Sequence, residues 1–251
     1  MSLIRYREKR DFKQTSEPQG GKPSKDKLVF VIQKHAASRL HYDFRLEMEG
    51  VLKSWAVPKG PSTDPATKRL AMFVEDHPFN YRDFEGKIPE GNYGAGTVIV
   101  WDEGTYEPLE EIEGKKKQDK HLLAQLKAGS IKIVMHGKKM KGEWALVRTN
   151  QSENSWLLIK HRDKYASTAD ITTKNKSVVS GKTLEQIEKA MSKDNGKNGA
   201  VKAGTAKKSS TKKSAAKTAT SKSSTKKSVA IASGKKSPSK KSVAKTIKKK
   251  A

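Results

Sequence analysis

Residues 34–47 have the sequence KHAASRLHYDFRLE, which combines side chains able to bind a metal and a phosphate. From Leu40 onward apolar and polar residues alternate. Because a β-strand has a side-chain period of two, we expect His41, Asp43 and Arg45 to share one face. Successive residues on that face stand about 7 Å apart, at roughly 3.3 Å of rise per residue. The apolar set should face the core and consists of Leu40, Tyr42, Phe44 and Leu46.

His35 lies a few residues before this strand and could approach the same face. Two histidines and one carboxylate are a suitable ligand set for a divalent transition metal. Arg45 follows the carboxylate by two positions and suits a phosphate at that metal, because its fork binds oxyanions through two hydrogen bonds. The alternative interpretation is an ordinary amphipathic strand whose polar face meets solvent.

A second group of candidate residues lies in VEDHPFNYRDFE, where His77 and Tyr81 are four positions apart. Pro78 disfavours a helix that starts before it but allows one turn after it. We expect His77 to donate to a phosphoryl oxygen or to protonate a leaving alkoxide, and Tyr81 to add a neutral donor. The alternative for His77 is a strand-end residue bonded to the backbone.

Two basic residues, Lys59 in the WAVPKG turn and Arg69 at the head of a strand, join the candidates, although such residues are commonly surface charges. The glycines of GKIPEGNYGAG do not form a phosphate-binding loop, since no Gly-Lys-Ser/Thr follows them. We expect turns there, before a strand over 97–101.

The elements that position these residues are short strands separated by Gly- or Asp-containing turns, which is typical of antiparallel hairpins. One helix is predicted from Lys116 to Ala128, with Gly129 as its stop signal. The fold class is therefore mainly β, a compact antiparallel β-barrel with one or two short helices. The predicted strands cover 28–35, 40–47, 51–60, 69–77, 96–108, 130–137, 142–149 and 155–161.

Composition divides the chain into four segments. Residues 1–27 are polar and predict a flexible arm outside the core, and residues 28–165 contain all four tryptophans and predict the barrel domain. Residues 166–195 predict a polar linker with a short helix that begins at a Thr183/Gln186 capping box. Residues 196–251 predict a disordered basic tail.

That tail carries 18 lysines and no acidic residue, which leaves +8 of the net charge of +26 for the preceding residues. It also has no aromatic side chain, so it cannot bury enough apolar surface to fold. Such lysine runs bind polyanions by counterion release without reading their sequence; a spacer is the competing interpretation. The lysine pairs expected to bind DNA are Lys207, Lys208, Lys212, Lys213, Lys226, Lys227, Lys235, Lys236, Lys240 and Lys241.

The chain has no cysteine, which excludes disulfides, thiolate zinc sites and cysteine nucleophiles. The first residues lack the apolar stretch of a secretory signal, and no segment is long and apolar enough for a membrane span. We expect a soluble, cytoplasmic, nucleoid-associated protein with no membrane partner.

Five long motifs resemble the 3′-phosphoesterase family, which occurs as one module of bacterial ligase D and as free-standing proteins. The motifs are HAASRLHYDFRLE, SWAVPKGPS, VEDHPFNYRDFEGKIPEGNYGAGTVIVWDEGTYE, WALVR and WLLIKHRDKYA. KRDFKQTSEPQG resembles the leading arm of that family, so the resemblance covers residues 5–165. It does not include the lysine-rich tail.

The resemblance implies a β-barrel hydrolase, activated by manganese, that trims DNA 3′ ends. It would remove a terminal ribonucleoside as a phosphodiesterase and then the 3′-phosphate as a phosphomonoesterase. The mixed nitrogen and oxygen ligands suit Mn²⁺ without excluding other divalent transition metals. The expected partners are DNA 3′ ends, an end-joining ligase and a Ku-type end binder.

The resemblance also implies a role for each matching residue of this chain. His35, His41 and Asp43 match the metal ligands. Arg45, His77 and Tyr81 match residues that engage the scissile phosphate. Lys59 and Arg69 match positions important for the phosphomonoester step, and Glu75 matches another active-site acid. Arg10, Asp11 and Glu17 match arm residues needed for ribonucleoside removal.

The rival hypothesis is a histone-like DNA-binding protein without enzymatic activity, whose function lies in the basic tail. A metal-dependent phosphatase acting on small molecules would fit the motif chemistry but leaves the tail unexplained.

Overall fold

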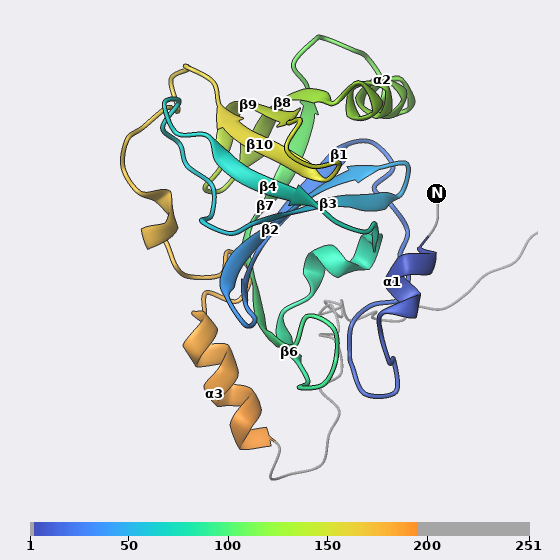
Figure 1. Cartoon of the computed structure of the whole chain (residues 1–251), viewed down its shortest axis with the longest axis vertical. Helices are drawn as coiled ribbons and strands as arrows, with labels where there is room; N and C mark the ends of the chain where they lie inside the picture. The colour runs from blue at the N-terminus through green and yellow to red at the C-terminus, as the bar shows by residue number, and fades with distance from the viewer. Residues whose placement is uncertain (1–2, 195–251) are drawn as a thin grey trace, which may run out of the picture. The chain divides into compact units, whose positions relative to one another are not determined.

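The computed structural model describes residues 3–194 (Figure 1), and the basic tail predicted over 196–251, with the ten lysines expected to bind DNA, lies outside these residues. No helix within the described part of the chain is long and apolar enough to cross a membrane. The helices are α1 (Ile4–Glu8), α2 (Lys115–Ala128) and α3 (Leu184–Asp194), with 3₁₀ turns η1 (Phe79–Asp83) and η2 (Ile171–Thr173). The strands are β1 (Leu28–Ala36), β2 (Leu40–Met48), β3 (Val51–Val57), β4 (Arg69–Phe73), β5 (His77–Pro78), β6 (Gly86–Ile88), β7 (Gly96–Pro108), β8 (Ser130–Gly137), β9 (Lys141–Arg148) and β10 (Ser155–Lys160).

Eight of these strands close into an antiparallel barrel, which confirms the predicted fold class. Their order is β1-β2-β3-β4-β10-β9-β8-β7, and β7 pairs with β1 to complete the ring. The short strands β5 and β6 lie outside the ring, on β3 and β7 respectively. Closure leaves the eight strands without a free edge.

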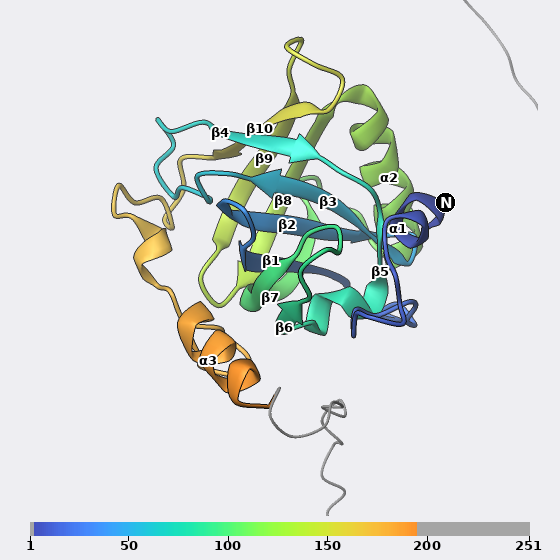
Figure 2. The ribbon, with the colours of Figure 1, turned by 60° about the horizontal axis from the view of Figure 1, so that its bottom comes forward.

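Alternation along each strand gives the sheet two differently covered faces. The barrel interior holds the main core, which includes Trp55, Trp101, Trp144 and Trp156. On the outer face of the barrel, a second apolar cluster involves Val31 of β1, Leu52 of β3, and Val98 and Val100 of β7. Side chains from α1, η1 and the residues after it cover that outer face, and Figure 2 shows these segments close to one another.

The turns and helix ends predicted from local sequence signals are present in the structure. Glu49 and Gly50 both adopt positive φ angles, 48° and 80°, as a two-residue hairpin loop between β2 and β3 requires. Gly129 ends α2 in the left-handed conformation. At the start of α3, the side-chain oxygen of Gln186 accepts from the backbone amide of Thr183 at 3.0 Å. The backbone amide of Gln186 donates to the Thr183 hydroxyl at 3.4 Å.

Three predictions about packing differ from the structure. Leu40 is 50 % exposed, because it stands at the end of β2 beyond the core. Tyr6 is fully buried in the second cluster and its hydroxyl donates to the Pro18 carbonyl at 2.6 Å, so the leading segment takes part in a core. In the linker, Ile171 is buried, and the Lys174 carbonyl accepts from the Trp101 indole at 2.6 Å.

Candidate metal centre

His35, His41 and Asp43 meet on the outer face of β1 and β2. His35 pairs directly with His41 across the two strands, and Asp43 follows His41 by two positions on the same face. One ligand atom from each residue lies within 4.8 Å of the other two. His35 Nδ1 is 3.5 Å and His41 Nε2 is 3.7 Å from the Asp43 carboxylate.

The second nitrogen of each imidazole is held by a backbone carbonyl. His35 Nε2 lies 3.0 Å from the Gly94 oxygen, and His41 Nδ1 lies 2.9 Å from the Arg39 oxygen. A carbonyl only accepts, so each of these nitrogens carries a proton, and the other nitrogen of each ring, which lies beside Asp43, is the one that can offer a lone pair to a cation. Metal-binding histidines typically have such a carbonyl partner. The three residues therefore fit a divalent cation.

Asp43 is buried and ionised. Burial raises the pKa of its carboxyl, but the Arg45 guanidinium, followed by the neighbouring imidazoles, lowers that pKa by more, so it lies well below the ordinary range. A buried, ionised carboxylate beside two imidazole nitrogens that can act as ligands is an arrangement that a cation stabilises.

Arg45 is held in one position beside this cluster. Its side chain is 2 % exposed and donates to Asp43 at 3.1 Å, to Gln33 at 2.8 Å and to Ser54 at 2.9 Å. Its guanidinium also lies over the Tyr81 ring, 4.8 Å from the centroid. The polar face of β2 is therefore covered rather than solvated, and the alternative of an ordinary amphipathic strand is wrong.

Gln33 and Ser54 were not among the residues identified from the sequence. Both are polar residues in largely buried strands and pair across the sheet with Asp43 and Arg45, respectively. Gln33 also donates to the carbonyls of Tyr81 and Phe84, at 2.9 and 3.0 Å. A polar residue next to the apolar part of a strand was the available signal, because its polar atoms need partners when the strand is buried.

His77 is buried between the sheet and the leading segment. Its Nδ1 donates to the Glu75 carbonyl at 2.9 Å, as the backbone-bonded alternative expected, and its Nε2 accepts from Arg10 at 3.3 Å. Burial, together with the charges of Arg45 and Arg10, holds its pKa well below 6.5. The imidazole is therefore neutral near pH 7 with its proton engaged, so this geometry does not support the general-acid role.

Comparison with known proteins agrees with this geometry. A sequence profile described as the DNA Ligase D 3′-phosphoesterase domain matches residues 33–148, which include the metal cluster, Arg45 and His77. The barrel belongs to the ligase D 3′-phosphoesterase family.

The curated relatives are much longer ligase D proteins. The chain is 50 % identical to the multifunctional non-homologous end joining protein LigD of Pseudomonas aeruginosa over 192 residues, which cover 72 % of the chain and 22 % of that relative. It is 47 % identical to LigD of Mycobacterium tuberculosis H37Rv over 157 residues, 62 % of the chain and 19 % of the relative. The chain thus spans about a fifth of the length of the relatives it matches.

In this 3′-phosphoesterase barrel, two of the three arm residues reach the second candidate group. Glu17 accepts from Arg10 at 2.9 Å and from the Tyr81 hydroxyl at 2.8 Å, and Arg10 also lies 3.5 Å from Glu75. Asp11 is exposed and accepts only local hydrogen bonds from Lys13 and Gln14, which shape a turn. The arm therefore brings Arg10 and Glu17 to His77 and Tyr81.

The remaining candidate residues have neighbours other than the metal cluster. Glu75 binds Lys9 at 3.0 Å; burial raises its pKa, but backbone and Lys9 hydrogen bonds lower it below the usual value. Lys59 is exposed just past β3, at the end of the sheet that also carries His41. Arg69 shares the core face of β4 with Ala71 and Phe73, and its charge acts on Asp170. The structure does not bring Lys59 or Arg69 into contact with the metal cluster.

Proposed function

We propose that this protein is a metal-dependent phosphoesterase that processes DNA 3′ ends. It first cleaves the phosphodiester before a 3′-terminal ribonucleoside, and then hydrolyses the remaining 3′-phosphate to a 3′-hydroxyl that a ligase can join. The metal is Mn²⁺. The membership of the barrel in the ligase D 3′-phosphoesterase family supports this assignment.

The observation that carries the proposal is the set of three convergent ligand atoms on His35, His41 and Asp43, next to a buried arginine. A divalent cation bound there would act as a Lewis acid on a phosphate oxygen and would lower the pKa of a bound water. Arg45 donates a hydrogen bond to Asp43, so its guanidinium lies beside the cluster and spreads the negative charge that develops on the phosphoryl oxygens.

The other residues of the site orient the phosphate and exclude water. Tyr81 and Arg10 both point at Glu17, so a phosphate oxygen entering there meets a hydroxyl and a guanidinium in place of that carboxylate. His77, neutral and bonded to Arg10, keeps this guanidinium in place. In the first step water adds to phosphorus, the bond to the 5′-oxygen of the terminal ribonucleoside breaks, and that oxygen takes a proton.

The direct test is incubation with a primer-template whose primer is labelled at its 5′ end and ends in one ribonucleotide, with and without Mn²⁺. We expect a 3′-phosphate product that is then converted to a 3′-hydroxyl, only when Mn²⁺ is present. Because metal Lewis acids contribute several kcal/mol, the acceleration should be at least about a thousandfold. A chelated sample that cleaves equally fast would contradict the metal-dependent mechanism.

The end-joining setting of the relatives leads us to propose a ligase and a Ku-type protein as functional partners at DNA ends. The tail over 196–251 then serves as a tether to the same DNA, by lysine–phosphate contacts that need no fixed structure. In the histone-like alternative, DNA binding by the tail is the whole function of the protein.

Deleting residues 196–251 separates these two roles. We expect turnover on short substrates to persist, while DNA affinity falls and its dependence on salt flattens as lysine–phosphate contacts are lost. The measurements are kcat on a short primer-template and DNA affinity over a series of salt concentrations. Turnover that disappears together with the tail would favour the DNA-binding alternative.

A further inference from the structure

The loop between β6 and β7, residues 89–95, contacts both the metal cluster and the arm. A turn hydrogen bond shapes it, in which the Ala95 amide donates to the Asn92 carbonyl at 3.1 Å. Gly91 and Gly94 adopt φ angles of 84° and 76°, which strain any other residue. The backbone therefore fixes where the groups of this loop lie.

At the metal cluster, Gly94 controls which nitrogen of His35 is free to bind a cation. Its carbonyl accepts from His35 Nε2 at 3.0 Å, while His35 Nδ1 lies 3.5 Å from the Asp43 carboxylate. A neutral imidazole has one proton, and these two oxygens compete for it. The Gly94 carbonyl keeps the proton on Nε2 and leaves Nδ1 as a ligand. Without that carbonyl, the carboxylate would draw the proton to Nδ1, where it blocks metal binding.

His35 depends on a distant segment for this partner, whereas His41 does not. The carbonyl that holds His41 Nδ1 belongs to Arg39, two positions earlier in the same hairpin, at 2.9 Å. Gly94 lies 59 positions from His35 along the chain, so their bond exists only while the β6–β7 loop stays in place. The loop thus controls the orientation of one ligand of the cluster.

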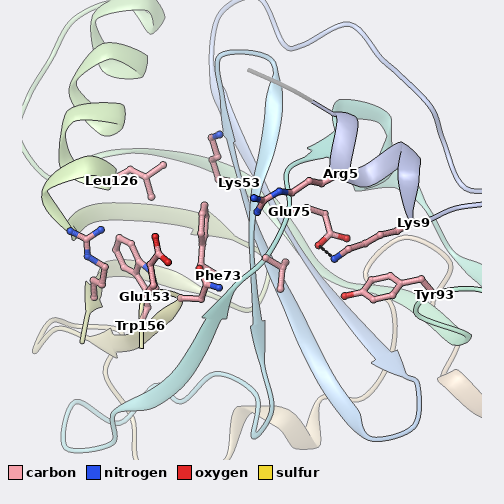
Figure 3. A pocket seen from close by; sticks show the side chains of 12 residues that line it. Arg5, Lys9, Lys53, Phe73, Glu75, Tyr93, Leu126, Glu153 and Trp156 are labelled. Carbon is pink, nitrogen blue, oxygen red and sulfur yellow. Dashed lines mark hydrogen bonds and ion pairs between the residues drawn. The ribbon is translucent and has the colours of Figure 1, made fainter. Parts of the chain in front are cut away.

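Tyr93, the neighbour of Gly94, contacts the arm. Lys9 Nζ lies 4.4 Å and the Arg10 guanidinium 5.9 Å from the centroid of its ring. Figure 3 shows Lys9 beside this ring, with its ammonium bonded to Glu75 at 3.0 Å. A cation near an aromatic face is attracted by the ring electrons. The docked arm therefore holds Tyr93, and with it the loop.

We propose that Tyr93 and Gly94 are positioning residues that couple the docking of the arm to the binding of a divalent cation at the metal cluster. Neither residue belongs to the ligand set. The arm holds Tyr93, and the carbonyl of the next residue keeps His35 ready to bind. By linkage, a bound cation favours the docked arm by the same factor by which the docked arm favours the cation. This inference rests on the metal site of the proposed function and adds that the arm and the metal assemble together.

The Mn²⁺ affinity of the full chain, measured by calorimetry without DNA, tests the role of Gly94. We expect G94A to weaken binding at least about tenfold, as is typical when a metal-binding histidine loses its partner. G91A is the matched control, because Gly91 has a φ of 84° in the same loop and an added Cβ there meets no atom within 4 Å. It imposes similar backbone strain away from His35 and should keep the native affinity. Equal losses in both variants, or native affinity in G94A, overturn the proposal.

Y93A tests the contact with the arm and leaves both glycines in place. Removal of a ring that attracts two cations should weaken Mn²⁺ binding about fourfold, although Tyr93 is not a ligand. Y165A is the control, because Tyr165 is 43 % exposed and Lys164 Nζ lies 5.2 Å from its ring centroid. It removes a comparable contact elsewhere. Native affinity in Y93A, or an equal loss in Y165A, contradicts the coupling.

Limited proteolysis with trypsin measures the reciprocal effect. Saturating Mn²⁺ should slow cleavage after Lys9 about fourfold in the native chain, because cleavage follows the population of the undocked arm. Y93A should lose this protection. Cleavage after Lys189, an exposed lysine of α3, should not respond to Mn²⁺ in either chain. Equal cleavage after Lys9 with and without Mn²⁺ in the native chain overturns the coupling.

The metal-free chain gives a readout that a general loss of stability would not produce. In ¹⁵N spectra at about pH 8, where imidazoles are ordinarily neutral, the His35 proton should lie on Nε2 in the native chain and in G91A. In G94A it should be shared between both nitrogens. His41, held by Arg39 within its own hairpin, should be the same in all three. A His35 spectrum that G94A leaves unchanged overturns the assignment.

Because these measurements need no DNA, the coupling and the proposed function fail separately. If no 3′ end is processed, the proposed function fails, whereas the loss of Mn²⁺ affinity in G94A and Y93A still supports the coupling. If ends are processed while both variants bind Mn²⁺ like the native chain, only the coupling fails. A native chain that binds no Mn²⁺ overturns both.

Discussion

H41A and D43N are each expected to lower kcat by at least about a thousandfold on a ribonucleotide-terminated primer-template with Mn²⁺. Each substitution removes one of the three ligand atoms that lie within 4.8 Å of one another. The structure favours asparagine over alanine at position 43. Arg45 donates to this carboxylate at 3.1 Å, and alanine would leave that buried guanidinium without its partner.

Metal binding itself provides the second measurement. Mn²⁺ at 100 times its Kd should stabilise the native chain by about 2.7 kcal/mol, which raises the Tm by several degrees. H41A and D43N should lose this shift while keeping the circular dichroism of the barrel.

H136A is the matched control for H41A, because His136 is an exposed histidine on β8 that pairs with Glu107 at 3.0 Å. It should retain both activity and the Mn²⁺-dependent shift. Near-normal turnover in H41A or D43N would refute the metal assignment.

The sequence was sufficient to predict this cluster because it depends on two local rules. Strand alternation places His41, Asp43 and Arg45 on one face, and a short antiparallel turn returns the chain so that His35 pairs with His41. Both rules act over fewer than about ten residues and need no knowledge of the rest of the fold. The strand periodicity and turn glycines predicted the barrel in the same way.

The surroundings of the cluster depend on contacts that the local pattern does not encode. Tyr6 lies in a polar segment, yet it packs edge-on against His77 with ring centroids 5.2 Å apart. The Tyr81–Glu17 bond joins residues 64 positions apart. Only the three-dimensional structure shows that Arg10 and Glu17 of the arm contact His77 and Tyr81, and that the Glu75 carbonyl engages the proton of His77.

R45K is expected to lower kcat about a hundredfold, although it keeps the positive charge. A lysine has one donor group on a flexible stem, whereas Arg45 reaches Gln33, Ser54 and Asp43 through three different nitrogens. The substitution leaves the amide oxygen of Gln33 buried without its partner, at a cost of about 2 kcal/mol in the free energy of unfolding. It also removes the planar group that stacks on Tyr81.

Kinetics and urea denaturation of R45K and R82K distinguish these effects. R82K makes the same exchange at an arginine of η1 that pairs with Asp83 at 3.0 Å, outside the metal cluster, and should change neither quantity. A loss of stability in R45K with unchanged kcat would make Arg45 a purely structural residue. A loss of kcat measured where R45K is still folded places its guanidinium on the phosphate, since charge alone does not replace the geometry of its fork.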